Sequence, residues 1–266
     1  MTSEADQNNG QAAQKQTLSD SDIFGNAFVF MFAGHETTAN ALHFPLVLLA
    51  LNWNIQRRLQ KDINKTLQGK PIREWDCDED FPKLFAGMGA AVMDETLRVI
   101  PAIPGISKAT MKNRPQPITL QGRQMIVPGD CHIALNGPAV HRHPRYWPCA
   151  SDRQGQNTSN DLDQFKPERW LVEASNSSSA SNTDHPVSFD EDMTGPSGLN
   201  TSSIFKPIKG SYIPFSDGYR SCLGRRFSQV EILAVLAVIF RDYSVELAVD
   251  QFSSDEQIDL MPKGKP

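Results

Sequence analysis

A ten-residue turn from Phe215 to Gly224, Phe-Ser-Asp-Gly-Tyr-Arg-Ser-Cys-Leu-Gly, places one cysteine directly before an apolar helical pattern. A cysteine at the opening of a helix meets unpaired backbone N–H groups and the positive end of the helix dipole, which favour the thiolate that metals bind. Gly218 permits a turn that side chains resist, and Gly224 leaves room for a flat cofactor against the following helix. The pattern predicts that Cys222 is a metal ligand, with a buried structural cysteine as the alternative.

Two further residues of this turn fit the same interpretation. Arg220 lies two residues before the cysteine, where its fork of donors would hold a carboxylate of the cofactor. Phe215 is expected to shield the sulfur from water. We therefore treat residues 215–224 as one candidate cofactor-binding loop, called the Cys222 loop below.

Polar residues interrupt an otherwise apolar run between Ile23 and Leu51, in the segment Ala-Gly-His-Glu-Thr-Thr at residues 33–38. Burying a carboxyl group and two hydroxyls in a hydrophobic helix costs free energy unless they find partners, so this pattern is typical of a site. Gly34 allows close approach of a ligand, and Thr37 is expected to bond back to a carbonyl one turn earlier. The alternative is a core helix with a satisfied pair of threonines.

A pair of opposite charges, Glu95 and Arg98, lies on a predicted helix at a spacing of three residues, which places both on one face. Such pairs are common on protein surfaces and carry little information alone. Further along the chain, residues 118–130 alternate in polarity around Gly122 and predict a β-hairpin. His141 and His143 follow, and we interpret them as structural histidines rather than as a zinc site, because no cysteine or carboxylate set lies near them in the sequence.

Four segments together resemble the cytochrome P-450 family: the Cys222 loop matches Phe-x-x-Gly-x-Arg-x-Cys-x-Gly, and residues 33–38, 95–98 and 167–170 match the oxygen-binding helix, Glu-x-x-Arg and Pro-Glu-Arg-Trp segments in the family's order. The resemblance implies a haem whose iron is bound by the Cys222 thiolate. It assigns cofactor contacts to Phe215, Gly218, Arg220, Gly224 and Gly34, and a loosely aligned haem-propionate contact to Lys108. It further implies that Thr37 steadies bound dioxygen, that Glu36 helps to deliver protons, and that Glu95, Arg98 and Arg169 form a buried structural triad bracing the Cys222 loop.

The function implied by this resemblance is a haem-dependent monooxygenase that inserts one atom of O2 into a lipophilic small molecule. Electrons would come from a separate NADPH-cytochrome reductase, because the sequence holds no Gly-x-Gly-x-x-Gly turn of its own. A long polar insertion is similar to those of fungal members, which suggests secondary metabolism. Full-length relatives are expected inside the cell on the cytoplasmic side of the endoplasmic reticulum, whereas this sequence shows no anchor.

The resemblance covers only the C-terminal portion of the family's fold, mainly α-helical with a small β-sheet, over residues 18–266. We therefore keep a second hypothesis, a truncated and non-catalytic remnant of such an enzyme. A third, a haem-thiolate isomerase or peroxide-using enzyme, is disfavoured by the Glu36 and Thr37 pair, which serves oxygen activation in the family.

Composition limits the remaining choices. The 266 residues carry 26 Lys and Arg against 31 Asp and Glu, a net charge of −5 without a basic stripe, so nucleic acid is not an expected partner. The four cysteines show no paired spacing, which favours a reducing compartment over disulfides. Polar segments at residues 1–17 and 173–204 are too poor in apolar side chains to offset chain entropy, and we expect both to be disordered.

Overall fold

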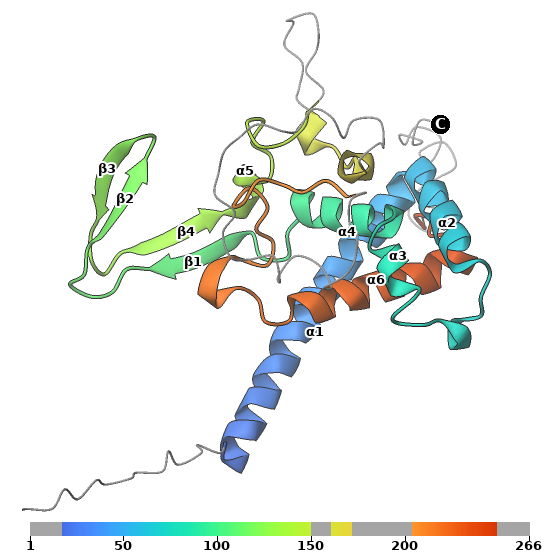
Figure 1. Ribbon diagram of the computed structural model, residues 1–266, viewed down its shortest axis with the longest axis horizontal. Helices are drawn as coiled ribbons and strands as arrows, with labels where there is room; N and C mark the ends of the chain where they lie inside the picture. The colour runs from blue at the N-terminus through green and yellow to red at the C-terminus, as the bar shows by residue number, and fades with distance from the viewer. Residues whose placement is uncertain (1–17, 150–160, 172–203, 249–266) are drawn as a thin grey trace, which may run out of the picture.

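The computed structural model describes residues 18–149, 161–171 and 204–248 (Figure 1). These residues form a mainly helical structure with two small antiparallel sheets, as the sequence predicted. The predicted leader at residues 1–17 and nearly all of the predicted insertion lie outside the described residues. The helices and strands are α1 (Asp20–Leu51), α2 (Trp53–Leu67), α3 (Phe81–Leu84), α4 (Met88–Val99), β1 (Gly105–Ala109), β2 (Gln116–Leu120), β3 (Arg123–Val127), β4 (His132–Asn136), α5 (Gly137–Val140) and α6 (Arg225–Asp242), with short 3-10 turns η1 (Ile72–Glu74), η2 (Asp161–Asp163), η3 (Pro167–Trp170) and η5 (Gly218–Arg220).

Helix α1 begins at a complete capping box. The Ser19 hydroxyl accepts a hydrogen bond from the Asp22 N–H, and the Asp22 carboxylate accepts one from the Ser19 N–H at 3.0 Å. The helix then runs without a break through the polar segment at residues 33–38 and past Pro45. Among the described helices, none combines the length and the apolar character needed to cross a bilayer.

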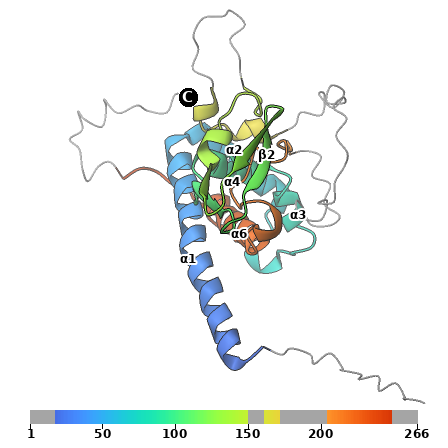
Figure 2. The ribbon, with the colours of Figure 1, turned by 90° about the vertical axis from the view of Figure 1, so that its left-hand side faces the viewer.

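The core lies where four helices meet. The C-terminal half of α1 packs with α2, α4 and α6, and residues such as Leu49, Leu59, Val92, Leu236 and Phe240 are fully buried there. The N-terminal half of α1 extends away from this body (Figure 2), and its large apolar side chains are exposed. The exposed set is Ile23, Phe24, Phe28, Val29, Phe30, Met31 and Phe32.

The two sheets each contain two strands. The predicted hairpin is confirmed as β2 and β3, joined by Gln121 and Gly122 with φ of 50° and 77°, the left-handed pair that a tight hairpin turn requires. Strands β1 and β4 pair in antiparallel register, with Lys108 opposite Ile133. The β2–β3 hairpin lies at the far end of this ladder (Figure 1), and β1 carries Lys108 toward the Cys222 loop.

The chain on either side of residues 172–203 meets in the fold. Leu171 and Ile204 form an antiparallel bridge, and the Phe205 N–H donates to the Trp170 carbonyl at 2.7 Å. Ile204, at the approximate end of the predicted insertion, is paired in this bridge. The bridge keeps η3 in register with the segment that leads to the Cys222 loop.

Candidate functional site

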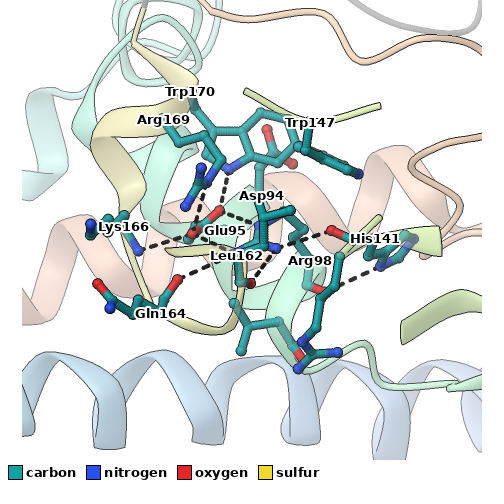
Figure 3. A network of polar contacts seen from close by, with 12 residues as sticks. Asp94, Glu95, Arg98, His141, Trp147, Leu162, Gln164, Lys166, Arg169 and Trp170 are labelled. Atoms are coloured by element: carbon teal, nitrogen blue, oxygen red, sulfur yellow. Dashed lines mark hydrogen bonds and ion pairs between the residues drawn. The ribbon is translucent and has the colours of Figure 1, made fainter. Parts of the chain in front are cut away.

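Glu95 lies at the centre of a buried polar cluster between α4 and η3 (Figure 3). Its carboxylate receives two hydrogen bonds from Arg98, at 2.7 and 2.9 Å, and one from the Trp170 indole N–H at 2.8 Å. The Lys166 backbone N–H adds a fourth at 2.9 Å. Glu95 is fully buried, so these bonds replace the water that the carboxylate loses on folding.

Arg98 is equally buried and uses all five of its N–H donors. Besides its two bonds to Glu95, it donates to the carbonyls of His141 at 3.0 Å, Leu162 at 2.8 Å and Gln164 at 3.2 Å. The guanidinium also lies 5.5 Å from the centre of the Trp147 ring. One side chain of α4 therefore ties together three segments that are distant in sequence.

Arg169 completes the charged cluster from η3. Its Nε lies 3.5 Å from Glu95 Oε1, and its side chain is only 4% exposed. The guanidinium also donates to the Pro148 carbonyl and to the Asp161 carbonyl, the latter at 3.0 Å. The structure thus brings Glu95, Arg98 and Arg169, hereafter the charged cluster, into contact.

His141 connects the charged cluster to the chain that leads into the Cys222 loop. Its Nδ1 lies 3.3 Å from the Arg98 carbonyl, and its Nε2 accepts the Ile213 N–H at 2.8 Å. Since a carbonyl only accepts and a backbone N–H only donates, the ring must be neutral with its proton on Nδ1. Burial lowers the pKa of His141 to about 4, in agreement with that state. The described residues hold no cluster of three or more His, Cys, Asp or Glu side chains that could bind a metal ion.

The Cys222 loop adopts a turn fixed by its backbone. Ser216 and Gly218 have φ of 63° and 79°, the left-handed region in which glycine carries no penalty. The Asp217 carboxylate accepts the Gly218 N–H at 2.7 Å, and the Cys222 N–H donates to the Phe215 carbonyl at 2.9 Å. Gly224 then caps α6, so Cys222 lies two residues before the cap of an 18-residue helix.

The side chains around Cys222 differ from the predicted arrangement in one respect. The cysteine is free and exposed, so the prediction that Phe215 shields the sulfur is not met within the described part of the chain. The Phe215 ring instead packs on the core, and the Arg225 guanidinium lies 5.6 Å from its centre. Arg220 is exposed, while Lys108 reaches the loop by donating to the Ser216 hydroxyl at 3.3 Å.

The polar segment of α1 is more exposed than predicted. Glu36 is exposed, Thr37 is half-buried, and the Thr37 hydroxyl donates to the Ala33 carbonyl at 2.7 Å, the bond back to the preceding turn that the sequence indicated. Of the three groups expected to be buried, the Thr38 hydroxyl lies on a buried side chain that is 5% exposed, whereas the Glu36 carboxyl is exposed. The predicted burial is therefore met by Thr38 and not by Glu36.

The site's backbone leaves space where a flat haem would approach. A Cβ added to Gly34 or to Gly224 would meet no heavy atom within 4 Å, so both glycines border open space. Cys222 supplies a free and accessible sulfur, and Arg220 and Lys108 supply cations on and beside the loop. These features fit a haem bound through a thiolate and through its carboxylates.

Sequence reasoning missed several residues that the structure places at these sites. Asp94 accepts a hydrogen bond from the Tyr212 hydroxyl at 3.0 Å, and burial raises the pKa of Asp94 to about 6 and that of Tyr212 well above its usual value. Trp170 was quoted in the Pro-Glu-Arg-Trp segment without a function, although its indole binds Glu95. The backbone groups of residues 162, 164 and 166 carry no sequence signal, because every residue has them.

Comparison with known proteins identifies one family along nearly the whole chain. The family model for cytochrome P-450 matches residues 2–265. A cytochrome P-450 monooxygenase of Arthrobotrys oligospora is 30% identical over 229 residues, and the monooxygenase prx9 of Penicillium rubens is 28% identical over 263 residues. The crystal structure of a cytochrome P-450, CYP102L1, superposes with a TM-score of 0.58 at 23% identity.

These similarities extend over only part of each relative. The alignments cover 86% and 95% of this chain but 36% and 40% of the two fungal proteins. The crystal structure shows the same disproportion, with 86% of this chain and 41% of the other covered. The chain therefore spans about two fifths of the length of the relatives that it matches.

Proposed function

Since this chain belongs to the cytochrome P-450 family, we propose that it forms the haem-binding C-terminal part of a monooxygenase that inserts one atom of O2 into a lipophilic small molecule. The observation that carries the proposal is the free, exposed Cys222 in a hydrogen-bonded loop at the start of α6. Two fungal relatives are named cytochrome P-450 monooxygenases, and this supports the proposed monooxygenase reaction.

Five residues of the chain would hold the haem. Cys222 would provide the thiolate ligand, and the Cys222 N–H bond to the Phe215 carbonyl fixes the backbone that carries it. Arg220 and Lys108 would pair with the haem carboxylates, and the bare backbone of Gly224 and Gly34 admits the ring. A haem with a thiolate ligand supplies electron density that favours O–O cleavage, the step needed before a C–H bond can be oxidised.

Glu36 and Thr37 of α1 would handle the protons that oxygen activation requires. The Thr37 hydroxyl donates its hydrogen bond to the Ala33 carbonyl, so its oxygen lone pairs can accept a hydrogen bond from another group. Glu36, exposed beside it, would exchange protons with solvent and pass them inward. Electrons would come from a separate NADPH-cytochrome reductase.

The charged cluster would act on structure rather than on chemistry. It joins α4 to η3 and, through His141, to the chain entering the Cys222 loop. Loss of one charge would leave its partner buried and unpaired, which costs about 3–5 kcal/mol. Such a loss would displace the loop and prevent stable haem binding.

A second candidate function is a truncated remnant without catalysis. The observation that favours it is coverage, because the chain spans about two fifths of its relatives and the apolar half of α1 is exposed. Against it, the residues required for haem and oxygen chemistry are present in all four segments.

The carbon monoxide difference spectrum of the reduced, purified 266-residue chain separates the two. Haem incorporation with a red-shifted, thiolate-type band, lost in Cys222→Ala, supports the haem-thiolate function. A chain that folds but takes up no haem supports the remnant. A haem that binds equally in wild type and in Cys222→Ala, with no thiolate band, contradicts Cys222 as the ligand.

A further inference from the structure

Two consecutive residues just upstream of the Cys222 loop are connected to α4, Tyr212 directly and Ile213 through His141. The Tyr212 hydroxyl donates to the Asp94 carboxylate at 3.0 Å and lies 3.2 Å from the Asp94 carbonyl. The next residue, Ile213, donates its backbone N–H to His141 Nε2 at 2.8 Å, and His141 is itself bonded to the Arg98 carbonyl. The chain is therefore held once through a side chain and once through its backbone.

The Tyr212 ring is fixed as firmly as its hydroxyl. It packs edge-on against Trp170 with ring centres 4.9 Å apart, and it also contacts Trp147 at 6.0 Å and His141 at 5.3 Å. Aromatic packing on three sides leaves the ring little freedom to rotate. These ring contacts hold Tyr212 in the orientation in which its hydroxyl donates to Asp94.

A short path of hydrogen bonds links these anchors to the cysteine. The Ser216 N–H donates to the Ile213 carbonyl at 3.1 Å, and the Cys222 N–H donates to the Phe215 carbonyl at 2.9 Å. Displacement of residues 212 and 213 would thus move the base of the loop that carries Cys222.

We propose that Asp94, Tyr212 and His141 are positioning residues that hold the entry of the Cys222 loop against α4, and so set where the Cys222 sulfur lies. The purpose of the loop, which is to bind haem, rests on the proposed function. The anchoring of the loop does not. The anchoring is a property of the chain whether or not haem is present.

Tyr212→Phe is the sharpest variant, because it removes one oxygen atom and keeps the ring within its aromatic contacts. Hydrogen–deuterium exchange is measured on the full 266-residue chain without haem, in peptides covering residues 213–222. We expect exchange there to become about tenfold faster than in wild type, while peptides of α2 keep their wild-type rates. A change smaller than threefold in residues 213–222 would overturn the proposal.

A matched control and a rescue test the mechanism. Tyr243→Phe makes the same change at a residue that is 67% exposed, and it should leave exchange in the loop unchanged. Asp94→Ala should accelerate exchange as Tyr212→Phe does, whereas Asp94→Asn, which keeps an oxygen acceptor for the hydroxyl, should preserve wild-type protection. Equal acceleration in Asp94→Ala and Asp94→Asn would contradict a hydrogen bond as the cause.

Haem-loaded protein gives a second readout besides activity. If wild type shows the thiolate-type carbon monoxide band, Tyr212→Phe should bind haem in the same ratio but convert a larger fraction to the band without thiolate. Failure of haem to bind in any variant counts against the proposed function alone, because the exchange experiment stands without haem. Unchanged bands together with unchanged exchange would reject the positioning residues while leaving the proposed function intact.

Discussion

The charged cluster and the residues proposed to bind haem or oxygen differ in how completely the described chain surrounds them. Glu95 and Arg98 are fully buried, and every N–H donor of Arg98 is used. Glu36, Arg220 and Cys222 are exposed. The comparison shows that the framework of the site is completed by the described residues themselves, whereas the reactive groups are held in place without being enclosed.

The largest loss of stability is expected from a substitution in the fully buried charged cluster. Arg98→Ala leaves the Glu95 carboxylate buried without its two strongest donors, and leaves three carbonyls without partners. We expect the free energy of unfolding to fall by about 3–5 kcal/mol, measured by urea denaturation.

The control for Arg98→Ala is an exposed ion pair. Arg58 lies 2.8 Å from Glu168, but the two side chains are 54% and 40% exposed, so water solvates both charges. Arg58→Ala should cost less than about 1 kcal/mol. Equal losses in both variants would show that burial does not distinguish the two pairs.

The free energy of unfolding should depend on pH through two buried groups near the charged cluster, Asp94 and His141. Burial raises the pKa of Asp94 to about 6 from 3.8, so the folded chain holds this proton more tightly than the unfolded chain. Its effect is to lower the free energy of unfolding as pH rises from about 4 to about 6. His141, with a pKa of about 4 against 6.5, has the opposite effect and raises stability between about pH 4 and 6.5.

Asp94→Asn should therefore remove one of two opposing slopes. Relative to wild type, the variant should gain on the order of 2 kcal/mol between pH 4 and pH 7, measured as the difference in free energy of unfolding at each pH. Asp163→Asn, at a side chain that is 76% exposed, serves as the control and should run parallel to wild type. A parallel profile for Asp94→Asn would mean that Asp94 is solvated as an ordinary carboxylate.

The sequence predicted those elements and side-chain pairs that are marked by a local pattern of residues. The β2–β3 hairpin and the pairing of Glu95 with Arg98 follow from turn residues and helical spacing. It did not predict the exposure of Glu36, because exposure depends on which other segments cover a helix. It also missed the Tyr212 bond to Asp94, since 118 residues separate the two and neither belongs to a motif.

Among the residues proposed to act on haem or oxygen, Thr37→Ala should change chemistry more than stability. The half-buried hydroxyl bonds only to the carbonyl of its own helix among the described partners, and alanine favours helix by a few tenths of a kcal/mol, so unfolding should shift by less than about 0.5 kcal/mol. If the proposed function holds, the haem-loaded variant should keep its haem but release more peroxide per electron consumed. Unchanged coupling of electron use to product would remove Thr37 from proton handling.

The smallest effect on stability is expected at the residue with the largest effect on function. Cys222 is exposed, and its described bond to the loop is made by its backbone N–H, which alanine retains. Cys222→Ala should therefore leave the free energy of unfolding within about 0.5 kcal/mol of wild type while abolishing the thiolate-type carbon monoxide band. A loss of stability as large as that of Arg98→Ala would show that Cys222 stabilises the fold. It would contradict the distinction between the buried charged cluster and the exposed site. The free energy of unfolding and the carbon monoxide band are independent measurements. Together, for Cys222→Ala, they decide whether the residues that stabilise the loop are different from the residue that binds the iron.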